Sequence, residues 1–275
     1  MTSAATSRVV LKSAREIELM RAAGLLVRSI LDAIEKIARP GATTNEMNAV
    51  ADRMIREAGA TALFLGVEHP SAKNPFPASI CASLNEEVVH GIPNDRPLVE
   101  GDIVSIDCGV RLKGYCGDHA RTFAIGEVSP EANRLLEVTS GALDLAIREM
   151  RPGLAWSKVA RRMQTYVQDA GFGVVRNYVG HGIGREMHEE PKVPNYVDPD
   201  GDFRLTPGLV VAIEPMVTAG SAATRQVGRD GWAVVTRDGS LAAHFEHTVA
   251  VTDKGVRVLT GASDKAAARD GENES

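Results

Sequence analysis

The sequence predicts a single α+β domain made of two related halves, in which helices cover one face of a curved, largely antiparallel sheet. Three observations lead to this fold class. Two pairs of amphipathic segments are each followed by several short apolar segments, glycine-containing turns suggest hairpins, and motifs of the first half recur in the second. The length of 275 residues and the hydrophobic content of 44% allow one large core.

Four helices are expected, because the amphipathic segments carry recognisable start or stop signals. Ser13 followed by Glu16 is a capping box, in which two side chains satisfy backbone donors of the first turn. Ser129-Pro130 starts the third helix in a similar way, and Arg-Pro-Gly or Ala-Gly sequences mark the helix ends. The expected helices cover residues 13–38, 44–57, 129–150 and 156–170.

Apolar segments between these helices predict strands, because they are short and are bounded by turn residues. Lys113-Gly114 and Asp238-Gly239 suit two-residue hairpin turns, which favour antiparallel pairing. The expected strands are IVSIDCGV (103–110), GYCGDHARTFAI (114–125), LVVAIEPMV (209–217), GWAVVT (231–236) and LAAHFEHTVAV (241–251).

The two halves are related by several motifs that recur in the same order. An Arg-Pro-Gly sequence, an amphipathic helix and an Ala-Gly stop occur in both 37–60 and 149–172. VVHGI (88–92) is echoed by VGHGI (179–183), and EGDIVSIDCGV is echoed by PGLVVAIEPMV in a way that aligns Asp107 with Glu214. Chance similarity of helix stops does not explain this alignment of acids, so we infer an internal duplication.

Charge and cysteine content narrow the class of protein. A net charge of −5 argues against a nucleic-acid partner or an acidic membrane surface. Three cysteines are too few for a disulfide framework, and no signal-peptide or membrane-spanning pattern occurs, so we expect a cytoplasmic protein. We expect the domain to cover 13–260, after an N-terminal arm (1–12) and before a disordered polar tail (261–275).

The first predicted hairpin places two acids on one face of the sheet. If Lys113-Gly114 is the turn, Gly109 pairs with Asp118, and Asp107 points to the same face as Asp118. Their carboxylates can then converge, with Cα atoms roughly 7–8 Å apart. Two buried anions at such a distance repel each other, so a proton or a cation must be present between them.

The second half contains two further acids in apolar strand segments, Glu214 and Glu246, and a glycine-rich sequence, VGHGIGREMHEEP (179–191), with His181 and His188. A single buried acid can be a satisfied structural group, but four placed alike in two halves are not explained by packing. Carboxylate oxygens with one imidazole are ligands for two divalent ions such as Mn, Fe, Co or Zn.

These motifs together resemble one family, the methionine aminopeptidases, and most closely the bacterial type I enzymes with the pseudo-two-fold pita-bread fold. The resemblance covers about residues 13–260. The motifs that carry it are NEEVVHGIP (85–93), SIDCGVRLKGYCGD (105–118), GHGIGREMHEEP (180–191), IEPM (213–216) and FEHT (245–248).

The resemblance implies a metal-dependent exopeptidase that removes N-terminal methionine when the second residue is small. Its implied ligands for two divalent ions (Co, Mn, Fe or Zn) are Asp107, Asp118, His181, Glu214 and Glu246. Asp107 is expected on one ion, His181 and Glu214 on the other, with Asp118 and Glu246 bridging them. The implied catalytic groups are His90 and His188, which contact the substrate, and Glu214, which moves a proton.

The resemblance also implies a substrate side-chain pocket, lined by Phe64, Phe76, Trp232 and Met187. The segment after Gly66, VEHPSAKNP, is about six residues longer than is usual for the family, and Val67 stands where an aromatic residue is expected. The prediction of specificity for methionine therefore rests on the resemblance, whereas the prediction of metal chemistry also rests on the residues themselves. Core packing explains Phe64 and Val67 equally well.

The remaining polar residues receive simpler interpretations. Strand alternation turns His119 and His247 away from the expected ligands, whereas His244 shares a face with Glu246 and could support the site. The cysteines are expected to pack as small apolar side chains. Glu189-Glu190 is expected to be a solvated turn.

Other functions on the same fold are disfavoured by the sequence. A proline-directed aminopeptidase would share the five ligands but usually has a long N-terminal domain, and a type II enzyme would need a helical insertion in the second half. A non-catalytic relative would be expected to lack ligands. The expected partners are nascent polypeptide N-termini, with at most a transient encounter with the ribosome, no nucleic acid and no membrane, and the expected state is a monomer.

Overall fold

The computed structural model describes residues 9–199, 201–228 and 230–262. Most of the predicted arm (1–12) and tail (261–275) therefore lies outside the described residues. Among the described residues, no helix is both long and apolar enough to cross a membrane.

Four long helices form at the predicted places: α1 (Ala14–Glu35), α2 (Thr44–Glu57), α3 (Pro130–Glu149) and α4 (Trp156–Asp169). The Ser13/Glu16 capping box is present, and Thr43 with Glu46 forms a second one at the start of α2. Helix α1 stops at Glu35, a few residues before the expected end.

The strands form two large and two small antiparallel groups. One large sheet has the order β1 (Thr61–Ala62), β4 (Ile103–Leu112), β2 (Cys81–Leu84), with β5 (Tyr115–Ala124) also on β4. The other has the order β15 (Gly255–Val258), β14 (His247–Thr252), β9 (Val210–Ile213), β7 (Gly180–Gly182), β8 (Glu189–Val193). One small group has the order β13 (Ala242–His244), β10 (Met216–Thr218), β6 (Gly173–Val174). The other has the order β11 (Thr224–Gln226), β12 (Val234–Thr236), β3 (Glu87–Val89).

Two strands predicted as continuous are each divided in two, and both divisions fall at an acid. LVVAIEPMV splits into β9 and β10 around Glu214, and LAAHFEHTVAV splits into β13 and β14 around Glu246. At Glu214 the chain leaves the five-stranded sheet and enters a small one, and at Glu246 it returns from that small sheet to the five-stranded one. The hairpin predicted at Asp238-Gly239 is wrong, because β12 and β13 belong to different sheets.

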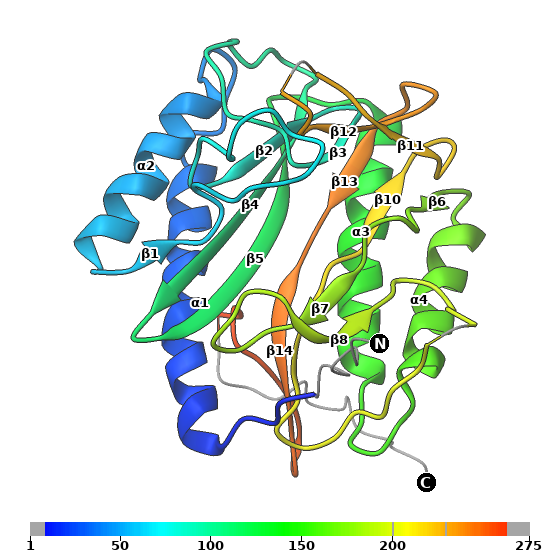
Figure 1. Cartoon of the computed structure of the whole chain (residues 1–275). Coiled ribbons are helices and arrows are strands. Elements are labelled where there is room, and N and C mark those ends of the chain that lie inside the picture. Colours follow the sequence, from blue (N-terminus) through cyan, green and yellow to red (C-terminus); the bar gives the residue numbers. More distant parts are fainter. Residues whose placement is uncertain (1–8, 200, 229, 263–275) are drawn as a thin grey trace, which may run out of the picture.

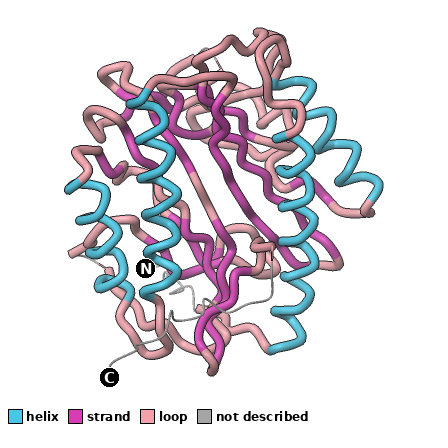
Figure 2. Tube along the Cα trace, turned by 180° about the vertical axis from the view of Figure 1, so that it is seen from behind, coloured by secondary structure: helices cyan, strands magenta, loops and turns pink. Residues whose placement is uncertain are grey.

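The helices cover the outer face of the strands as two pairs, which confirms the predicted fold class. Helices α1 and α2 lie behind β4 and β5, and α3 and α4 lie behind the second half of the strands (Figures 1 and 2). Each pair packs on its own apolar core: one contains Ile30 and Ile106, and the other contains Trp156 and Val249. The opposite, open face of the strands is where the acids of β4 and β5 point.

Helix α1 approaches β5 closely enough that only glycine fits at the crossing. A Cβ at Gly117 would lie 2.6 Å from the backbone nitrogen of Gly24, and a Cβ at Gly24 would lie 2.4 Å from the Leu259 oxygen. Because backbone atoms cannot rotate away, the extra methyl group must separate helix and sheet.

Gly117→Ala is therefore expected to lower the free energy of unfolding by about 1–3 kcal/mol, as overpacking of a tight core does. Chemical denaturation followed by circular dichroism measures this. Gly201→Ala is the matched control, since the nearest atom to its Cβ is 3.8 Å away, and it should change little. Equal stability of both variants would contradict the close packing.

Candidate metal centre and active-site pocket

The open face of the sheets contains a cavity of about 540 Å³ that is bounded by both halves of the chain. Every side chain predicted for the site lines it. These are Phe64, Phe76, His90, Asp107, Asp118, His181, Met187, His188, Glu214, Trp232 and Glu246.

The first two acids reach the cavity from the β4–β5 hairpin, whose predicted register is confirmed. Leu112 pairs with Tyr115, and Gly109 pairs with Asp118. Asp107 and Asp118 thus share one face, as period-two alternation requires. The backbone of Asp118 is tied to the other half, because its N–H donates to Thr248 Oγ1 and its carbonyl accepts from the same hydroxyl.

His181 lies on the short strand β7, which pairs with β9 and β8 in the second half. Its Nδ1 is 2.9 Å from the Gly182 carbonyl oxygen, so Nδ1 holds the proton and Nε2 is left with its lone pair. That Nε2 lies 3.7 Å from Asp118 Oδ2 and 3.7 Å from Glu214 Oε1. This is the tautomer that a metal-binding histidine needs.

The remaining two acids, Glu214 and Glu246, lie at the breaks between β9 and β10 and between β13 and β14. The Glu246 N–H donates to the Ala120 carbonyl of β5, and the Glu214 carbonyl accepts from the Asn195 side chain. Both backbones are therefore fixed by bonds to neighbouring elements, while their carboxylates lie in the cavity.

The carboxylates are buried without enough donors to satisfy them. Asp107 Oδ1, Asp118 Oδ1 and Glu246 Oε1 have no hydrogen-bond partner among the described residues. Burial and the neighbouring carboxylates raise the pKa of the Asp118 and Glu246 carboxyl groups well above their usual values. Burial raises the pKa of Asp107 to about 7.

Divalent cations would satisfy this arrangement. One ligand atom from each of Asp118, His181 and Glu246 lies within 4.8 Å of the others. Several oxygen donors with one imidazole suit Mn, Fe, Co or Zn. The unpaired oxygens, and not the resemblance alone, show that these residues fit such ions.

Two further histidines border the cluster and remain neutral near pH 7. Burial lowers the pKa of His90 to about 4 and also lowers that of His188. The His188 ring lies 4.4 Å from that of His181, and His90 lies 5.6 Å from the ring of Tyr178. A neutral imidazole offers one N–H donor, so each can donate a hydrogen bond into the cavity.

Comparison with known proteins places the chain among peptidases. Residues 18–253 match the model of metallopeptidase family M24. The chain belongs to this family. A methionine aminopeptidase of Clostridium acetobutylicum is 48% identical over 92% of this chain and 98% of its own length. The crystal structure of methionine aminopeptidase from Rickettsia prowazekii has a TM-score of 0.87 and 38% identity, over 92% of this chain and all of that one.

More distant solved structures share the fold alone. The Xaa-Pro dipeptidase from Bacillus anthracis has a TM-score of 0.70 and 22% identity, and it matches 93% of this chain but only 63% of its own. The resemblance to methionine aminopeptidases inferred from the sequence motifs is confirmed by the much higher identity to that group.

Beside the acids, this M24 chain has an apolar lobe of the cavity. Phe64, Phe76, Cys81 and Trp232 form one buried cluster, with Met187 packed against it. Phe76 contacts Trp232 edge to face at 5.1 Å, and the indole N–H donates to the Asn74 carbonyl. The lobe is lined by aromatic rings and sulfur, which suits a flexible thioether side chain.

The histidines outside the ligand set lie as strand alternation predicts. His119 and His247 stack on each other at 4.5 Å and do not line the cavity. His244 Nε2 lies 3.5 Å from Glu214 Oε2. Burial alone would lower the pKa of His244, yet Glu214 and Asp107 raise it.

Some residues that line the cavity were not predicted to do so, and Tyr178 and Cys81 are two of them. The strand register pairs Cys81 with Asp107, but this pairing could not be read from the chain because a loop separates the two strands. The expected turn at Glu189-Glu190 is wrong, since both residues begin strand β8 and Glu189 forms an ion pair.

Proposed function

We propose that this chain is a methionine aminopeptidase that removes the N-terminal methionine of peptides and nascent proteins with a small second residue. The observation that carries the proposal is the adjacency of the two lobes of one cavity. A carboxylate cluster, together with the His181 imidazole whose Nε2 has a lone pair for a metal, borders an apolar lobe of aromatic and sulfur-containing side chains. The names of relatives 42–48% identical over most of the chain support the same reaction.

The proposed centre would hold two divalent ions, with Asp107 as a ligand of one, His181 and Glu214 as ligands of the other, and Asp118 and Glu246 as shared ligands. Such ions supply a nucleophilic water at neutral pH and polarise the scissile carbonyl. Cobalt, manganese, iron and zinc are all compatible with these donors.

The protein's own groups then orient the substrate and move protons. The apolar lobe holds the methionine side chain next to the carboxylates, which attract the free α-ammonium group. Glu214 takes a proton from the attacking water and transfers it to the departing nitrogen. His188 and His90 donate hydrogen bonds to the carbonyl oxygen as negative charge develops on it.

The cellular setting is proposed on the same basis. We assign the chain to the cytoplasm as a monomer that acts on emerging polypeptide N-termini. A transient encounter with the ribosome is compatible with this role, and no nucleic-acid or membrane partner is proposed.

A peptide assay tests the reaction and the metal requirement together. Met-Ala-Ser should be cleaved about 10- to 100-fold faster than Leu-Ala-Ser, because one altered side chain in an apolar pocket changes rates by that much. Chelation should abolish turnover, and Mn, Co or Fe should restore it. Preference for an Ala-Pro peptide, or no cleavage with any of these metals, would overturn the proposal.

A further inference from the structure

The segment 184–189 carries three lining residues, Met187, His188 and Glu189, yet it has little regular structure before β8. Its shape depends on one side chain at its end. Glu189 Oε1 accepts hydrogen bonds from the backbone N–H groups of Arg185 at 2.9 Å and Glu186 at 3.2 Å. The carboxylate thus closes the segment, which contains Met187 and His188, into a compact loop.

The other oxygen of this carboxylate meets a lysine from the beginning of the described chain. Lys12 Nζ lies 2.6 Å from Glu189 Oε2 and also donates to the Val10 carbonyl at 2.8 Å. The Lys12 side chain is 3% exposed and that of Glu189 is 14% exposed, so this ion pair is largely shielded from water. Removal of one partner of such a pair leaves an uncompensated buried charge.

The backbone around Lys12 is adapted to this contact. The Lys12 N–H donates to the Gly208 carbonyl at 2.7 Å, next to β9. A Cβ at Gly184 would lie 2.5 Å from both Lys12 Cε and Glu189 Oε1, so the pair passes directly over a position that has no side chain. Lys12 is therefore held by its own backbone while its ammonium group reaches the loop.

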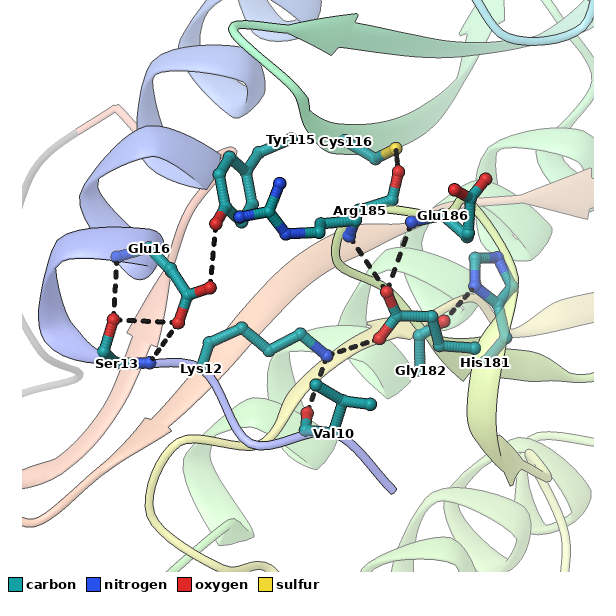
Figure 3. Close-up of polar contacts among 11 residues, drawn as sticks. Val10, Lys12, Ser13, Glu16, Tyr115, Cys116, His181, Gly182, Arg185 and Glu186 are labelled. Atoms are coloured by element: carbon teal, nitrogen blue, oxygen red, sulfur yellow. Dashed lines mark hydrogen bonds and ion pairs between the residues drawn. The ribbon is translucent and has the colours of Figure 1, made fainter. Parts of the chain in front are cut away.

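The far side of the loop is fixed by the β4–β5 hairpin. The Cys116 N–H donates to the Gly184 carbonyl, and Arg111 pairs with Glu186 at 2.7 Å. Figure 3 shows Lys12 and Val10 below, Tyr115 and Cys116 of the hairpin above, and the loop residues Arg185 and Glu186 next to the hairpin. Because the hairpin also carries Asp118, the loop is held in a defined position relative to the acids.

We propose that Lys12 is a positioning residue, which acts through Glu189 to hold His188 and Met187 against the reacting bond. Lys12 does not line the cavity and touches no reacting atom. Loss of its charge lets the Glu189 carboxylate turn to water and release the Arg185 and Glu186 N–H groups. The expected change in kcat rests on the proposed function. The expected displacement of the loop rests on the geometry alone.

The kinetic test compares Lys12→Met with Lys12→Arg in the full chain, with Mn present and Met-Ala-Ser as substrate. Lys12→Met should lower kcat about tenfold, as loss of a supporting contact behind a catalytic group does, with KM changed less than about threefold. Lys12→Arg should recover most of kcat, because it keeps the ion pair. An unchanged kcat in Lys12→Met would overturn the proposal.

A double variant separates positioning from a simple effect of charge. In Lys12→Met with Glu189→Gln, no uncompensated carboxylate remains, yet the anchor is still absent. The positioning role predicts a kcat as low as in Lys12→Met alone. Recovery of kcat in the double variant would overturn the role, since the lone charge would then explain the loss.

A readout without turnover keeps this inference separate from the proposed function. The methyl NMR signal of Met187, labelled with ¹³C and assigned by Met187→Leu, should shift or broaden in Lys12→Met and return in Lys12→Arg. Asp32→Asn, which removes an ion pair of α1 with Arg121 on the outer side, is the matched control and should leave this signal unchanged. An unchanged Met187 signal in Lys12→Met overturns the inference even if the wild type cleaves no peptide.

Discussion

Asp118→Asn is expected to lower kcat/KM by about 10³-fold or more while leaving the fold intact. Asp118 is the carboxylate assigned to both ions, and an amide is a much weaker ligand for hard divalent cations. The side chain keeps its volume, and one of four clustered acids loses its charge. Stability of the metal-free protein should therefore not fall, because burial and the neighbouring carboxylates already disfavour the charge of Asp118, whose Oδ1 has no hydrogen-bond partner among the described residues.

Steady-state kinetics with Met-Ala-Ser, metal content and circular dichroism check this result. Asp102→Asn is the matched control, because Asp102 is also buried but lies away from the cavity and has donors from Asn85, Val99 and Arg96. Burial opposes these donors, yet the pKa of Asp102 is lowered overall, so its charge contributes stability above its unfolded pKa. The control should lose stability and keep activity; the same pattern in Asp118→Asn would contradict the metal assignment.

The features that could be predicted from sequence are the ones decided within a few residues. Capping at Ser13 and the Lys113-Gly114 turn depend on neighbouring side chains and backbone angles, so the first helix and the first hairpin could be placed in advance. The hairpin register then put Asp107 and Asp118 on one face without any knowledge of the rest of the fold. The full ligand set came from the resemblance and not from this local geometry.

The features that could not be predicted depend on contacts between distant segments. An apolar run such as LVVAIEPMV reads as one strand, and only the packing of both halves decides that it leaves one sheet and enters another at Glu214. The ion pair of Lys12 with Glu189 joins residues 177 positions apart, so neither residue shows a local signal of it. Glu189 looked like a solvated acid because its partner is remote in the sequence.

His188→Ala is expected to lower kcat by about 10²–10³-fold with little change in KM, because the lost hydrogen bond is made chiefly in the transition state. Desolvation lowers the pKa of His188 from its usual value, so at pH 7.5 and above the imidazole is neutral and donates through a single N–H, and the loss should not depend on pH between about 7.5 and 8.5. Kinetics with Met-Ala-Ser across this range measure both quantities, and metal content checks that the centre is retained.

His188→Gln separates the donor from the ring. Glutamine places an N–H near the position of the imidazole nitrogen, so it should recover part of kcat, whereas alanine should recover none. Because His188 packs 4.4 Å from His181, the alanine variant could also disturb a proposed ligand, and unchanged metal content in both variants excludes this. A kcat for His188→Ala within threefold of the wild type would show that the oxyanion is stabilised without this imidazole, and would leave His90 and the metal centre to do so.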